Sequence, residues 1–235
     1  MSLPEKILLT FAALIGIAGT VISRAAPDFF TGKFVIEDGV IEWLTVAALV
    51  ASAVLMLRRA WVLRRVRTPL FLFVTVMAAM VFLFGAGEEI SWGQRIFSVE
   101  TPGWLESRNK QSEMNLHNLV IGGHSINKLI FSKGLGLVLL VYLLVIPAIC
   151  RKSPLRAARM DRLGVPLPRT WHVILWISIL VLTEVAVGTG KRGELREVLL
   201  TTILFVQLLR PLNHWIYDRE RILVPVDSGL TETAR

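Results

Sequence analysis

Apolar residues gather in long blocks along this chain, not in the short alternating runs of a soluble domain. Six blocks stand out, near residues 7–23, 38–57, 69–87, 129–149, 170–190 and 196–216. Helices satisfy their own backbone hydrogen bonds, so apolar blocks of this length are typical of helices that cross a bilayer. The pattern therefore predicts an all-α, polytopic membrane bundle of about six transmembrane helices.

Charged residues between the blocks predict its orientation. The loop after the second block, "RRAWVLRRVR", has five arginines, and the loop after the fourth carries Arg151, Lys152, Arg156, Arg159, Arg162 and Arg169. Short loops rich in Lys and Arg stay in the cytoplasm. With both termini on that side, 16 of the 26 basic residues are cytoplasmic and 12 of the 18 acidic residues face outward. The two counts agree on one topology.

Composition narrows the class of protein further. The net charge of +8 arises from the loop arginines, so it does not predict a nucleic-acid partner. The single cysteine, Cys150, excludes an internal disulfide and a multi-cysteine metal site. We expect one transmembrane domain over residues 1–221, with an uncleaved first helix, and a disordered cytoplasmic tail over residues 222–235.

A polar segment, residues 88–128, separates the third and fourth blocks. Trp92, Phe97 and Trp104 stand among its charges, a mixture typical of helices lying at a membrane interface. Thr101–Pro102 predicts a helix start there. We therefore expect an extracytoplasmic interfacial helical segment between the third and fourth spans.

Candidate chemistry concentrates in this segment, in "GAGEEISWGQRIF" (85–97) and "QSEMNLHNL" (111–119). If the third helix continues, Glu88, Trp92 and Arg95 share one face. A helix would also place Glu113 and His117 on one face, where they could share a divalent metal or form an acid–base pair. The alternative is that both are interfacial polar residues that hydrogen-bond the loop.

Span lengths bring a further acid to the same side of the membrane. Only 15 uncharged residues separate Glu42 from Arg58. They make about 22 Å of helix, against a hydrocarbon core of about 30 Å, so Glu42 is drawn to the outer boundary or below it. We expect these residues to converge on one pocket. The candidate roles are catalytic for Glu88, Glu89, Glu113 and His117, metal-binding for Glu42, Glu88, Glu113 and His117, and substrate-binding for Trp92, Gln94, Arg95 and Asn118.

Two charges fall inside the later apolar blocks. Glu184 interrupts the fifth block and Arg210 the sixth. Ionisable groups at such depths usually face a bundle interior or a wet cavity, and function is the default hypothesis. The alternative is a structural ion pair or a side chain that reaches the interface. His172 and His214 lie on the cytoplasmic side, where we treat them as interfacial.

The two quoted motifs, carrying GEEISWGQR and NLHN, resemble a family of polytopic bacterial inner-membrane proteins with the same signatures, over about residues 37–125. The resemblance implies a location in the bacterial inner membrane and the importance of this segment. No activity is known to us for that family, so it implies no reaction.

Three functions remain open. One is a membrane enzyme, with a divalent metal such as zinc as a candidate cofactor, that acts on a lipid or lipid-linked head group; Arg95 would bind the anionic head group. Another is a proton- or ion-coupled transporter module that uses Glu184 and Arg210. The last is a non-catalytic accessory or assembly subunit, whose partners would be other membrane subunits.

Overall fold

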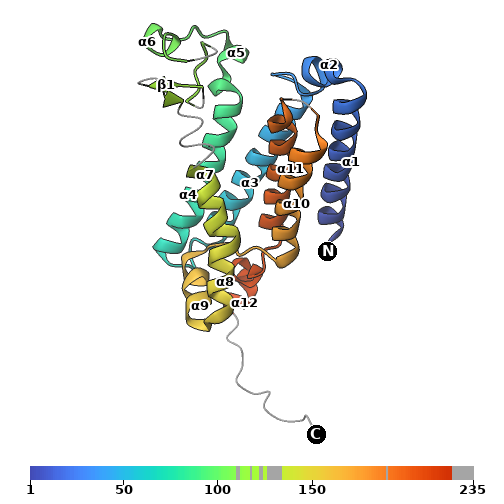
Figure 1. Ribbon diagram of the computed structural model, residues 1–235. Helices are drawn as coiled ribbons and strands as arrows, with labels where there is room; N and C mark the ends of the chain where they lie inside the picture. Colours follow the sequence, from blue (N-terminus) through green and yellow to red (C-terminus); the bar gives the residue numbers. More distant parts are fainter. Residues whose placement is uncertain (110–111, 117, 122–123, 126–133, 189, 224–235) are drawn as a thin grey trace, which may run out of the picture.

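The chain folds into long helices joined by short turns, as a computed structural model shows. It describes residues 1–109, 112–116, 118–121, 124–125, 134–188 and 190–223. In Figure 1, α5 and α6 lie at one end of the bundle, and α9 and α12 lie at the opposite end. These are called the α6 end and the α9 end below.

The first helix, α1 (Leu3–Ala25), begins with a capping box, in which Ser2 and Glu5 exchange side-chain to backbone hydrogen bonds. A short helix, α2 (Pro27–Phe29), and a π-helical turn, η1 (Phe30–Phe34), follow at the α6 end. Gly19 lets α1 approach its neighbour closely, because a Cβ there would lie 2.7 Å from a methyl carbon of Leu195.

The helices α3 (Val40–Leu63) and α4 (Pro69–Glu89) form an antiparallel pair, and α11 (Arg192–Leu209) packs along α3. Thr68 caps the start of α4 through the backbone N–H of Phe71. Ala53, Met56, Ala79 and Leu208 are buried where these three helices meet. This trio positions the site described below (Figure 1).

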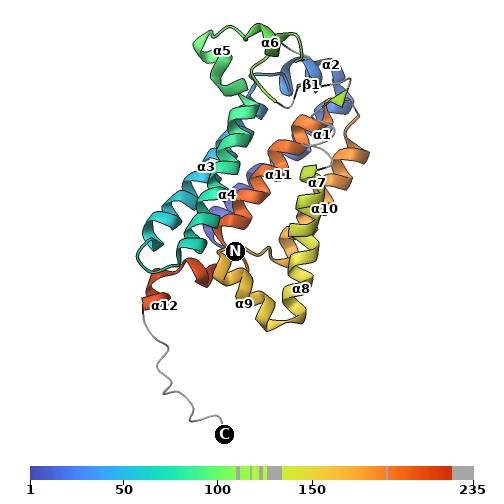
Figure 2. The same ribbon diagram turned by 90° about the vertical axis from the view of Figure 1, so that its left-hand side faces the viewer.

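A rod made of α7 (Leu135–Leu140), the π-helical turn η4 (Val141–Val145) and α8 (Ile146–Lys152) runs beside α10 (Thr170–Ala186). Figure 2 shows the rod, α10 and the connecting helix α9 (Pro154–Leu163) on one side of the molecule. Leu143 and Trp176 pack with Ile203 of α11 between them. Gln207 of α11 also donates a hydrogen bond to the hydroxyl of Tyr142, at 2.6 Å.

Short elements complete the fold. After α4 come a 3₁₀ turn, η2 (Ser91–Gly93), two single-turn helices, α5 (Gln94–Phe97) and α6 (Gly103–Glu106), and an antiparallel pair of two-residue strands, β1 (Val120–Ile121) and β2 (His124–Ser125). After α11 come η5 (His214–Tyr217) and α12 (Arg219–Leu223).

Each of the six predicted spans contains a helix in its described part, but within the described ranges only four meet the length and apolarity needed to cross a membrane: α1, α3, α4 and the α7–α8 rod. Apolar side chains point outward from these helices; Ile17, Val81 and Val138 are more than half exposed. Such surfaces indicate an integral membrane protein. The apolar helix α10 is shorter, at 17 residues, and charges occupy the first turns of α11.

The third helix ends at Glu89, close to its predicted end, because Ser91 and Trp92 adopt positive φ angles of 47° and 55°. The continuation considered above, which would align Glu88, Trp92 and Arg95, therefore does not form. Bends and irregular chain stand at residues 112–116 in place of the helix considered at Glu113. Ile222 and Leu223, assigned to the tail, form the end of α12. Residues 224–235 lie outside the described part of the chain, as does His117.

Candidate functional site

Arg95, on α5, joins three separate segments at the α6 end. Its Nε lies 2.9 Å from an oxygen of Asp38, just before α3, and its Nη2 lies 3.3 Å from Oε1 of Glu42. Its Nη1 lies 2.7 Å from Oε1 of Glu113. The Glu42 and Glu113 side chains are only 8% and 14% exposed. The guanidinium therefore neutralises two largely buried carboxylates and clamps the segment after α4 onto α3.

The second oxygen of Glu113 is also engaged. It accepts hydrogen bonds from Ser91 Oγ at 2.8 Å and from Asn115 Nδ2 at 2.7 Å. Asn109 supports this arrangement, because its side-chain oxygen accepts from the backbone N–H of Glu113 and its Nδ2 donates to Asn115. The Ser91 side chain reaches Glu113 from the left-handed turn that ends α4. Both oxygens of Glu113 thus serve to hold the fold.

Glu88, near the end of α4, likewise uses both of its carboxylate oxygens to hold the fold. Its Oε1 accepts from the indole N–H of Trp92, and its Oε2 accepts from the backbone N–H of Leu116. Gln94 makes a parallel link, with its oxygen accepting from the backbone N–H of Met114. Glu88 at the end of α4 and Gln94 on α5 thus hold residues 114 and 116 in place.

Glu89 differs from these acids. None of the described residues donates a hydrogen bond to it, although its carboxylate lies close enough to Glu42, Glu88, Glu194 and Glu197 for their charges to interact. These acids come from α3, α4 and α11. Carboxylates gathered in this way repel one another unless a proton or a cation neutralises some of the charge. Glu89 is therefore the acid of this cluster best placed to exchange a proton or to meet a ligand.

The structure brings some of the predicted site residues together. Glu42, Glu113 and Arg95 are in direct contact, and Glu88 lies beside residues 113–116. Asn118 is held through its backbone N–H, which donates to Asn115. Trp92 is half exposed, with its ring against Phe84. The placement of His117 stays a prediction.

A metal was predicted between Glu42, Glu88, Glu113 and His117. A guanidinium occupies the space between Glu42 and Glu113, and Glu88 is held by Trp92 and Leu116. No group of three or more His, Cys, Asp or Glu side chains within the described ranges is arranged to hold a metal ion. Glu42, Glu88 and Glu113 are thus engaged by other groups within the described ranges. His117 lies outside those ranges, so the metal site stays a prediction.

Glu184 and Arg210 lie away from the carboxylate cluster. Glu184 is 52% exposed and pairs with two arginines of α11, at 2.6 Å to Arg192 and 3.4 Å to Arg196. Arg210 is exposed at the end of α11. The geometry of Glu184 is that of a structural ion pair between α10 and α11.

Several polar groups near the α9 end are buried, which the sequence analysis did not predict. His172, expected at an interface, is fully buried, and its Nδ1 accepts from the backbone N–H of Arg169. Glu5 is buried too, close enough to His172 and Arg169 for their charges to interact. Helical periodicity could have indicated His172, because it lies one turn before the buried Trp176.

Two of the loop arginines are structural as well. Arg59 stacks on the ring of Tyr217 at 3.9 Å, and Arg67 donates to the backbone oxygen of Ile216. Burial raises the pKa of the Tyr217 hydroxyl and lowers the pKa of the Arg67 guanidinium. These contacts hold Ile216 and Tyr217, in the chain after α11, against the end of α3 and the loop between α3 and α4.

No family model, curated protein or solved structure matches this chain. Its function is therefore inferred from the geometry of its own residues.

Proposed function

We propose that this integral membrane protein is an enzyme of the bacterial inner membrane that acts on the head group of a lipid or lipid-linked substrate. Glu89 serves as its general acid–base group. The observation that carries the proposal concerns the predicted catalytic acids within the described ranges. Among them, Glu89 alone receives no hydrogen bond from a described residue, while its charge interacts with those of four other carboxylates.

The position of Glu89 suits a head group. It is the last residue of α4, a helix long and apolar enough to cross the membrane. The end of such a helix lies where the hydrocarbon meets the polar head groups. With both termini in the cytoplasm, as the loop arginines predict, the α6 end faces outward. The substrate would then be presented in the outer leaflet.

The surrounding acids suit Glu89 to proton transfer. Repulsion from neighbouring carboxylates favours the protonated form of one member of the cluster. In that form Glu89 can protonate a leaving oxygen, and once ionised it can take a proton from an attacking water or hydroxyl. Arg95 is committed to three carboxylates, so we assign it to holding the site and not to binding an anionic substrate.

The lipid composition of cells tests this proposal. Cells that lack the protein, complemented with wild type or with Glu89→Gln, are compared by mass spectrometry of total lipid extracts. We expect wild type to alter one head-group class and Glu89→Gln to leave the profile of the deletion strain. Glu184→Gln is the matched control, since it removes an acid from a half-exposed ion pair. Identical profiles in all strains would refute a lipid-modifying enzyme.

Proton- or ion-coupled transport is the second candidate, now centred on Glu89 and not on Glu184 and Arg210. It is favoured because Glu194 and Glu197 come from α11 while Glu42 comes from α3, so one cluster couples three helices. Proteoliposomes with a pH-sensitive dye inside would show proton flux that Glu89→Gln abolishes. Flux together with an unchanged lipid profile would select transport over the enzyme.

A further inference from the structure

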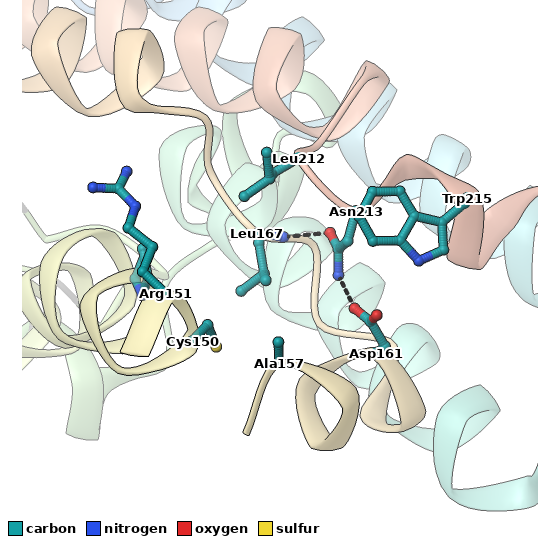
Figure 3. A pocket seen from close by; sticks show the side chains of 9 residues that line it. Cys150, Arg151, Ala157, Asp161, Leu167, Leu212, Asn213 and Trp215 are labelled. Atoms are coloured by element: carbon teal, nitrogen blue, oxygen red, sulfur yellow. Dashed lines mark hydrogen bonds between the residues drawn. The ribbon is translucent and has the colours of Figure 1, made fainter. Parts of the chain in front are cut away.

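A small cavity opens at the α9 end, far from the carboxylate cluster. Its volume is about 150 Å³, and α8, α9 and the chain after α11 enclose it. Figure 3 shows Cys150, Ala157, Leu167 and Leu212 around the hollow, with Trp215 and Arg151 on opposite sides. Two stretches distant in sequence, 147–167 and 212–215, thus build one site.

The interior of this cavity is apolar. Pro147, Leu167, Leu212 and the ring of Trp215 contribute to its wall. Two polar lining residues are already bonded to each other, because Asn213 Nδ2 donates to Asp161 Oδ1 at 2.7 Å. The oxygen of Asn213 accepts from the backbone N–H of Leu167 at 2.8 Å. The cavity therefore suits a hydrocarbon chain and not a polar solute.

Basic residues lie at and next to the lining of the cavity. Arg151 is part of the lining, and Lys152 at the end of α8 and Arg156 in α9 follow it closely in sequence; all three are exposed. Residues 151–169 contain six basic side chains and one acid, Asp161, which is bound to Asn213. One Nη of Arg151 donates to Thr170, which steadies the guanidinium at the edge. An apolar hollow with an arginine at its edge thus lies within a stretch of chain that carries an excess of positive charge.

We propose that this cavity binds an anionic phospholipid of the cytoplasmic leaflet. Part of an acyl chain enters the hollow, and the phosphate meets Arg151 and Lys152. Basic pockets at the cytoplasmic ends of membrane helices recognise anionic head groups in this way. The inference relies on the membrane orientation given above, but it is independent of the chemistry at Glu89.

Cys150 provides a reporter for this site, because it lines the cavity and is the only cysteine in the chain. The purified full chain is placed in nanodiscs of phosphatidylcholine, alone or with increasing phosphatidylglycerol, and the rate of alkylation by a maleimide is measured. We expect phosphatidylglycerol to slow alkylation. Each cation near an anionic surface contributes roughly five-fold in affinity, so Arg151→Gln/Lys152→Gln should weaken protection by roughly 25-fold.

Controls separate this site from a general surface charge. Arg219→Gln/Arg221→Gln removes two exposed cations from α12 at the same end and should leave protection unchanged. Soluble glycerol phosphate should not protect Cys150. Equal protection in wild type and Arg151→Gln/Lys152→Gln would overturn the proposal, as would protection by soluble phosphate. A change in Cys150 alkylation in pure phosphatidylcholine would reveal misfolding, and the single Arg151→Gln variant would then replace the pair in the same titration.

Discussion

Replacing Arg95 with glutamine removes the one cation that joins Asp38, Glu42 and Glu113. Glu42 and Glu113 are largely buried, whereas Asp38 is 51% exposed. Breaking a fully buried ion pair costs about 3–5 kcal/mol, and an exposed pair contributes about 0–1 kcal/mol. Because the Arg95 side chain is itself 29% exposed, we take a value near the lower end of the first range. The expected cost is about 3 kcal/mol, confined to the segment after α4.

Hydrogen–deuterium exchange measures this loss directly. The backbone N–H groups of Met114 and Leu116 donate to Gln94 on α5 and to Glu88 at the end of α4, so they report opening of the segment. A loss of about 3 kcal/mol should speed their exchange by roughly 100-fold, while the amides of α3 and α11 stay unchanged. Arg192→Gln, which breaks a half-exposed pair with Glu184, should alter exchange little anywhere.

A second substitution checks the mechanism. In Arg95→Gln the main penalty is the charge left on Glu113, so adding Glu113→Gln should recover part of the lost protection. If Arg95→Gln exchanges at the wild-type rate, the three contacts do not hold the segment and the structural role assigned to Arg95 is wrong.

Three further predictions follow from packing, hydrogen bonding and topology. Gly19→Ala should destabilise the α1–α11 contact by about 1–3 kcal/mol in thermal unfolding, because its Cβ would overlap a leucine of α11. Gly136→Ala meets no neighbour and should be neutral or stabilising. Trp92→Phe loses the bond to Glu88 and should cost about 1 kcal/mol in the same assay; an unchanged melting temperature would refute that bond. In a chain whose native cysteine is replaced by alanine, a cysteine at Ser107 should react with an impermeant thiol reagent in intact cells, and one at Arg156 should not; the reverse would invert the topology.

The sequence predicted the long helices well, because their signal is local. Each apolar block contains the residues that make it helical, and α1, α3 and α4 lie within a few residues of the predicted spans. The number of membrane crossings is less secure, because α10 is short and α11 begins with charges. Composition alone does not decide between a spanning helix and one held by its neighbours.

The site was predicted only in part, because its contacts depend on a turn. The sequence left open whether the third helix continues through Arg95, and positive φ angles at Ser91 and Trp92 end it before that residue. That turn sends Arg95 to Glu42 and Glu113, which lie 53 and 18 residues away in sequence. Non-glycine residues rarely adopt positive φ angles, and no simple sequence pattern predicts where they do. The proximity of Glu194 and Glu197 to Glu89 likewise depends on helix packing and not on spacing.

The rate of head-group conversion by the purified protein tests the central claim most directly. The chain is reconstituted in liposomes made from the lipid class that changes in cells, and the product is measured by mass spectrometry for wild type, Glu89→Gln and Glu184→Gln. Loss of a general acid–base group lowers the rate by about 100-fold or more, so Glu89→Gln should be nearly inactive while Glu184→Gln retains the wild-type rate. Conversion by Glu89→Gln at the wild-type rate would contradict the role assigned to this carboxylate.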